Sequence, residues 1–110
     1  MERTFSMLKP DTVRRGLVGE VIGRIERKGL RIVAMKMITI THEQAEQLYA
    51  EHKGKDFYQR LVDFITSGAV VVMVIEGENV ISNMRNIMGA TDPLKAQPGS
   101  IRGDLATYIT

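Results

Sequence analysis

Hydrophobic residues follow strand-like and helix-like periods in turn along most of the chain. Residues 3–9 place Phe5 and Met7 on one face and predict a short strand. Residues 31–40 are rich in β-branched and apolar side chains and predict a second strand. The run AVVVMVIE, residues 69–76, is almost continuously apolar and is bounded by glycines. Such a run is typical of a central strand covered on both faces, so we expect it in the middle of a sheet.

Helical periods occupy the segments between these strands. Apolar residues recur at helical spacing over residues 13–25, which predicts one helix with an Asp11 N-cap and an end at Gly29. Thr41 and Gln44 form a capping-box pattern, which predicts the start of a short second helix.

Two further helices complete the pattern. One should begin at Asp56, which again has a glutamine three residues later. The other should run from an Asn79 N-cap to Gly89, with five apolar residues turned inward: Val80, Ile81, Met84, Ile87 and Met88.

The periodicity disappears over residues 90–104, where prolines and glycines replace apolar anchors. A long irregular stretch inside a small domain is usually functional or disordered, so we expect a functional loop here. Within it, we expect a glycine turn to present Arg102, with Gly103 supplying backbone freedom and Asp104 serving a structural role.

The order of elements predicts an α+β fold of the ferredoxin-like kind, an antiparallel sheet covered by helices. At 110 residues the chain should form a single domain over residues 1–110. The ferredoxin-like fold needs a fourth strand after the last helix, and we expect that strand to be lacking in this chain.

Composition narrows the function classes. The absence of cysteine excludes disulfides, zinc–thiolate sites and thiol catalysis. No apolar run approaches the length of a membrane span, and the N-terminus has no signal-peptide pattern, so we expect a cytoplasmic protein. A net charge of only +2 argues against a nucleic-acid-binding surface, which needs clustered basic residues.

No glycine-rich phosphate loop is present, so any phosphate must be held by side chains. Arginine offers a bidentate fork to phosphate oxygens and lysine a point charge. The candidates are Lys9, Arg85, Thr91 and Arg102. Each also has a structural interpretation, as a solvated strand end, a helix-edge arginine, a turn threonine and a loop cation, and spacing alone does not decide between the two.

The aromatic and histidine residues are less informative. Tyr49 and Phe57 flank a break in the helical region, where they could belong to the core or line a cleft. We expect His42 at a surface position at the start of a helix and His52 near a helix end. Neither histidine has an assignable carboxylate partner, so both are weak candidates for a nucleophile or base.

Three stretches together resemble the nucleoside diphosphate kinase family: ERTFSMLKPDTVRRGLVGEVIGRIERKGLRIV, LVDFITSGAVVVMVIEGENV and MGATDPLKAQPGSIRGD. The resemblance covers essentially the whole chain. It implies a ferredoxin-like fold, tetramers or hexamers, and transfer of a γ-phosphate from nucleoside triphosphates to nucleoside diphosphates, ATP, GTP and ADP among them. It also implies a ping-pong mechanism through a phosphohistidine, with Mg²⁺ on the nucleotide phosphates.

The same resemblance implies roles for individual residues. Four match the family's phosphate-binding residues: Lys9, Arg85, Thr91 and Arg102. Phe57 matches the aromatic residue that stacks on the base, and Tyr49 matches the tyrosine beside the catalytic histidine. The loop over residues 90–104 matches a long loop of the nucleotide site.

One family feature is missing from these 110 residues. The family's nucleophile lies in an N-x-x-H-x-S-D segment after Arg-Gly-Asp, so we expect it beyond Thr110 and transfer its role to neither His42 nor His52. We expect the 110-residue chain alone to be inactive and the sequence to be an incomplete nucleoside diphosphate kinase. The alternatives are a short nucleotide-binding relative without transferase activity and, less favoured by the charge, a nucleic-acid binder.

Overall fold

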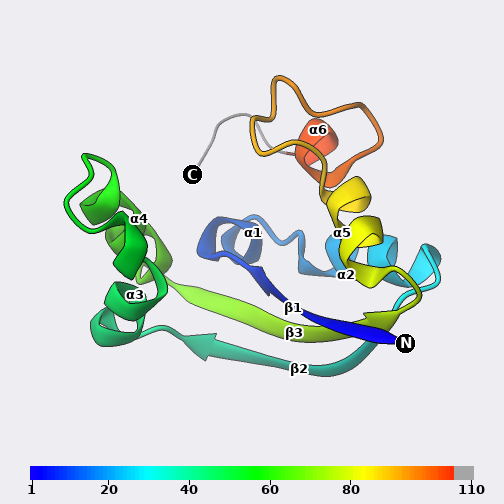
Figure 1. Cartoon of the computed structure of the whole chain (residues 1–110), viewed down its shortest axis with the longest axis horizontal. Coiled ribbons are helices and arrows are strands. Elements are labelled where there is room, and N and C mark those ends of the chain that lie inside the picture. Colours follow the sequence, from blue (N-terminus) through cyan, green and yellow to red (C-terminus); the bar gives the residue numbers. More distant parts are fainter. Residues whose placement is uncertain (106–110) are drawn as a thin grey trace.

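The computed structural model describes residues 1–105, in which three strands form one antiparallel sheet. The strands are β1 (Glu2–Leu8), β2 (Arg31–Thr39) and β3 (Ala69–Gly77), in the order β1-β3-β2 (Figure 1). β3 pairs with β1 over residues 71–77 and with β2 over residues 69–76, which confirms its predicted central place. The predicted α+β fold is confirmed, and within residues 1–105 the sheet has no fourth strand.

Helices occupy the connections between the strands. Their bounds are α1 (Pro10–Arg14), α2 (Val18–Arg27), α3 (His42–Leu48), the 3₁₀ helix η1 (Ala50–His52), α4 (Tyr58–Ile65), α5 (Val80–Met88) and α6 (Ile101–Leu105). Figure 1 shows α1, α2 and α5 over one face of the sheet, with α3 and α4 together at one end. None of the helices described is long and apolar enough to cross a membrane.

The core divides into two clusters because the side chains of β3 alternate between two environments. Val71, Met73 and Ile75 pack with residues of α2, α5 and α6 in the larger cluster. Val70 packs with Ala45, Val62 and Ile65 beneath the α3–α4 hairpin, together with Ile40. The sheet therefore supports two separately packed regions of the molecule.

The single helix predicted over residues 13–25 was wrong, since two helices, α1 and α2, are present there. Gly16 separates them with φ of +70°, a backbone conformation that other residues rarely adopt. The predicted Asp11 cap was also wrong. Lys9 is the N-cap residue, Pro10 follows in the first turn, and Asp11 makes no capping hydrogen bond.

The other predicted helix starts differ in outcome. The Thr41–Gln44 capping box is confirmed, because both of its reciprocal hydrogen bonds are present. Asp56 does not cap α4, whose N-cap residue is Phe57. Asn79 is the N-cap residue of α5, but its side chain makes no cap hydrogen bond.

One of the five residues of α5 that were predicted to point inward is exposed instead. Ile81 is 46% exposed, whereas Val80 and Met84 are buried as predicted. The end of the helix at Gly89 is confirmed, with φ of +83° at that residue.

The segment over residues 90–104 is irregular at first and then forms α6. Arg102 therefore lies on a short helix, and the predicted glycine turn at this point was wrong. Gly103 is helical, and a Cβ atom there would collide with the Gln97 carbonyl oxygen. A glycine is therefore required at position 103 because the backbone of Gln97 lies close to it, and not because the chain needs an unusual backbone conformation there. The predicted domain end at Thr110 lies outside the described residues.

Candidate functional site

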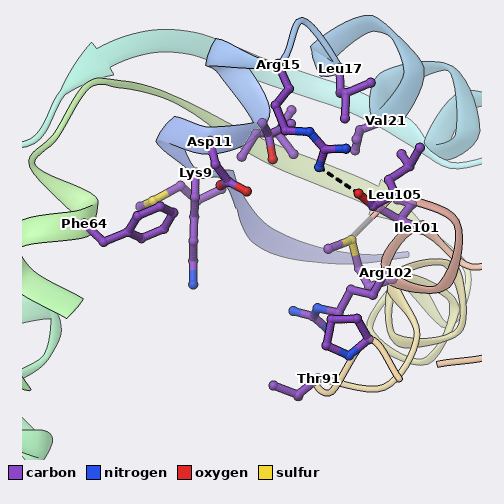
Figure 2. A pocket seen from close by; sticks show the side chains of 15 residues that line it. Lys9, Asp11, Arg15, Leu17, Val21, Phe64, Thr91, Ile101, Arg102 and Leu105 are labelled. Carbon is purple, nitrogen blue, oxygen red and sulfur yellow. Dashed lines mark hydrogen bonds between the residues drawn. The ribbon is translucent and has the colours of Figure 1, made fainter. Parts of the chain in front are cut away.

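A cavity of about 200 Å³ opens at the end of β1, where the strand meets α1. Lys9, Thr91 and Arg102 line it (Figure 2). These three residues come from the β1–α1 junction, the loop after α5, and α6, so the fold joins segments from opposite ends of the sequence. Phe64 of α4 lies on the side of the α3–α4 hairpin, near Lys9.

A wider groove of about 1090 Å³ adjoins this cavity. Lys9, Thr91 and Arg102 line the groove as well, and Arg85 reaches it from α5. The four phosphate candidates from the sequence are thus brought to one continuous depression. We call these four residues the cationic site, after its three positive charges and one hydroxyl group.

The charged side chains of Lys9 and Arg102 in the cationic site are partly buried. Burial is the main cause that lowers the pKa of Lys9, and the positive charge of Arg102 lowers it further, while Asp11 acts in the opposite direction. Arg102 itself is half-buried, and its Nη1 donates to the Gly89 carbonyl oxygen at 3.0 Å. Two cations that disfavour each other in this way would be stabilised by an anion placed between them.

The aromatic candidates lie elsewhere, on the α3–α4 hairpin. We call Tyr49, His52 and Phe57 the aromatic cluster: the ring centroids of His52 and Phe57 are 5.4 Å apart, and those of Tyr49 and His52 are 6.3 Å apart. The Lys55 ammonium lies 5.7 Å from the centre of the Phe57 ring. None of the cluster lines the cavity or the groove.

The members of the aromatic cluster differ in exposure. Tyr49 packs against the smaller core cluster, and burial raises the pKa of its hydroxyl. Phe57 is 37% exposed, so part of its ring is open to a ligand. His52 lies at the end of η1, and its Nδ1 is 3.5 Å from the Lys55 Nζ. His42 begins α3 and is exposed, as predicted.

Sequence patterns did not identify several residues that build the site. Phe64 and Asp11 line the cavity, and Arg15 donates from Nη1 to the Leu105 carbonyl oxygen at 2.7 Å. Phe64 and Arg15 lie within helical or turn segments where their residue types are common, so no local signal marks them. Arg24 of α2 forms an ion pair with Asp104 at 2.8 Å, and no local signal marks this pairing either.

Comparison with known proteins shows the family. The model of the family described as nucleoside diphosphate kinase matches residues 2–110. A nucleoside diphosphate kinase from Archaeoglobus fulgidus is 65% identical over 109 residues, which are 99% of this chain and 72% of that protein. One from Thermus thermophilus is 61% identical over 109 residues, 99% of this chain and 80% of that protein.

A solved structure agrees with the sequence relatives. It is described as a halophilic nucleoside diphosphate kinase from Halobacterium salinarum in complex with CDP. The two structures superpose with a TM-score of 0.95 at 50% identity, covering 98% of this chain and 71% of that chain. On the family match and these relatives, the chain belongs to the nucleoside diphosphate kinase family.

Proposed function

We propose that the complete protein transfers the γ-phosphate of a nucleoside triphosphate to a nucleoside diphosphate. The observation that carries the proposal is the convergence of Lys9, Arg85, Thr91 and Arg102 on one depression. Membership of the family and the CDP complex of the halophilic relative support a nucleotide as the ligand. The four residues then act as the phosphate-binding set.

The chemistry of the cationic site suits a phosphoryl group in transfer. Negative charge is spread over the oxygens of that group, and positioned cations stabilise it. Arg102 retains guanidinium hydrogens beyond the one donated to Gly89, and Lys9 supplies a half-buried ammonium that water screens poorly. Thr91 supplies a hydroxyl that can donate a hydrogen bond to a phosphate oxygen.

We assign the transfer to a ping-pong mechanism with a histidine carrier. A histidine nitrogen attacks the γ-phosphorus, an N–P bond forms, and the bond from phosphorus to the bridging oxygen breaks to release the diphosphate. A second diphosphate then attacks the phosphohistidine and regenerates the imidazole. By family resemblance the carrier is the histidine of an N-x-x-H-x-S-D segment. We do not assign this role to His42 or His52, which line neither the cavity nor the groove.

Mg²⁺ is expected to bind with the nucleotide. Among residues 1–105, no three acidic, histidine or cysteine side chains gather in a group that could hold a metal ion. This is compatible with Mg²⁺ held chiefly by substrate phosphates and water, the usual arrangement for this ion. Asp11, which lines the cavity, is a carboxylate that could contact its water shell. When bound, the ion would neutralise phosphate charge.

The remaining assignments follow from the family. We propose that Phe57 stacks on the base, that Tyr49 packs beside the carrier histidine, and that the single domain assembles as a tetramer or hexamer in the cytoplasm. Stacking on one aromatic ring accepts any base, which fits a broad range of nucleosides. The partly open ring of Phe57 is compatible with this role.

Incubation of the full-length protein with ATP labelled at the γ-phosphate tests the proposal. The expected product is a protein-bound phosphate that is labile to acid and stable to base, and that passes to added diphosphates of several bases. The Arg102→Ala variant should form this adduct more slowly. Nucleotide binding without any adduct would instead indicate a binding protein without transferase activity and would overturn the transfer.

A further inference from the structure

Asp104 joins three parts of the structure through its carboxylate. Oδ2 accepts from Arg24 Nη1 at 2.8 Å, and Oδ1 accepts from the Gly99 backbone N–H at 2.8 Å. Arg24 in turn donates from Nε to Glu20 Oε1 at 2.9 Å. We call Glu20, Arg24, Gly99 and Asp104 the clasp, because it ties α2 to the irregular loop and to α6.

Asp104 and Arg102 lie on the same short helix but point in different directions. Residues two apart on a helix do not face the same side. Asp104 contacts α2, while Arg102 lines the cavity. A helix of only five residues has little stability of its own, so tertiary contacts decide its position. The clasp thus holds one side of α6 while the other side presents Arg102.

The charges of the clasp are mutually stabilised. The Gly99 N–H, first, and Arg24, second, lower the pKa of the Asp104 carboxyl. The hydrogen bonds from Arg24 to Glu20 and then to Asp104 raise the pKa of the guanidinium. Asp104 and Arg24 therefore both stay ionised at neutral pH. Both carboxylate oxygens of Asp104 are engaged, so an amide in its place cannot reproduce the pattern.

We propose that Asp104 and Arg24 are positioning residues, which hold α6 so that Arg102 is placed to bind the phosphates. This inference rests on the proposed function, since it concerns the same site. It assigns to the aspartate of Arg-Gly-Asp and to a residue 80 positions away a shared role in nucleotide binding. Neither residue lines the cavity or contacts the place where the phosphates would lie.

The test is a double-mutant cycle on CDP binding in the full-length protein. Asp104→Asn removes the negative charge at nearly constant size, and we expect roughly 10-fold weaker CDP binding by calorimetry. In the Arg102→Ala background the same change should have little further effect, because its effect acts through Arg102. A residue that only stabilises the fold would weaken both backgrounds equally. Equal affinity for Asp104→Asn and wild type, or additive losses, overturns the proposal.

A matched control separates this effect from the loss of any surface ion pair. Arg3 Nε and Glu76 Oε2 form a pair of the same length, 2.8 Å, between β1 and β3. Arg3→Gln should leave CDP affinity within about twofold of wild type, since exposed pairs contribute little. A loss as large as that of Asp104→Asn would show that the clasp is not special and would overturn the proposal.

Hydrogen exchange distinguishes failure of the clasp from failure of the proposed function. The Gly99 amide donates to Asp104 Oδ1, and the Gly103 amide donates to Ser100 Oγ. Both amides should exchange their hydrogens faster in Asp104→Asn than in wild type. If wild type binds no CDP, the proposed function fails, and with it the role of Arg102. If wild type binds CDP but exchange is unchanged in the variant, the positioning role alone fails.

Discussion

The cationic site and the aromatic cluster are built in opposite ways. Lys9 and Arg102 are distant in sequence, and meet only because β1 and α6 are both anchored to the larger core cluster. Tyr49, His52 and Phe57 lie within one short hairpin and contact each other locally. The positions of the cations thus depend on the whole fold, whereas the positions of the aromatic rings depend on the hairpin alone.

This difference has a functional consequence under the proposed function. Defects in the packing of α6 should affect phosphate binding for every nucleotide at once. Defects in the hairpin should affect the base and leave phosphate binding intact. Four variants test whether the two regions act independently, and their expected effects decrease in the order given.

Gly103→Ala should have the largest effect on the cationic site. The new Cβ atom would collide with the Gln97 carbonyl oxygen, so the loop and α6 must move apart. We expect a stability loss of about 1–3 kcal/mol by denaturant unfolding, and loss of CDP affinity by up to roughly 100-fold as Arg102 is displaced. Gly19→Ala is the control, because Gly19 is also helical but has open space around its Cα. Equal behaviour of the two variants would contradict the close approach at Gly103.

Arg102→Ala removes one cation without disturbing the core. Its charge-assisted hydrogen bonds to phosphate should contribute about 1.5–3 kcal/mol, so CDP affinity should fall roughly 10- to 100-fold. Stability should fall by about 1 kcal/mol or less, from loss of the bond to the Gly89 carbonyl. Calorimetry and thermal unfolding measure the two effects, and unchanged CDP affinity would argue against a phosphate-binding role.

Phe57→Ala tests the aromatic cluster separately. Stacking on an aromatic ring is worth about 1–3 kcal/mol, and we expect the lower end, roughly a 10-fold loss of affinity. The loss should be similar for CDP and ADP, because any base has a face to stack. Inorganic tripolyphosphate, which has no base, should bind wild type and variant equally. A matching loss for tripolyphosphate would show that the hairpin and the cationic site are not independent.

Lys9→Met should weaken CDP binding and yet stabilise the protein without nucleotide. The folded state lowers the pKa of Lys9, so its charge opposes folding at neutral pH. For wild type, this cost diminishes as pH rises through the folded pKa toward the ordinary value of 10.5. The melting temperature of Lys9→Met should therefore exceed that of wild type at pH 7, with the difference shrinking at alkaline pH. A lower melting temperature at pH 7 would contradict this.

Local chemistry predicted much of the fold. The apolar run over residues 69–76 identified the central strand, because a strand covered on both faces needs few polar residues. The Thr41–Gln44 capping box is complete within four residues, so its two hydrogen bonds could be predicted from sequence. Motif resemblance also selected the four residues that now share one depression.

Features that depend on distant partners could not be predicted in this way. Two of the wrong predictions had a local cause instead: Lys9 and Pro10 set the start of α1, and the left-handed backbone at Gly16 ends it. The close approach of Gly103 to Gln97 and the pairing of Arg24 with Asp104 have no local signal.

The order of the three strands, the place of the central strand and the membership of the family could be predicted from the sequence alone, since these rest on periodicity and on motifs along the chain. The helical position of Arg102, the contact of that helix with α2, and the separation of the cations from the aromatic cluster became clear only from the folded structure. The physical reason is that periodicity records which faces are buried, whereas ion pairs, backbone contacts and the convergence of charges depend on segments that meet only after folding.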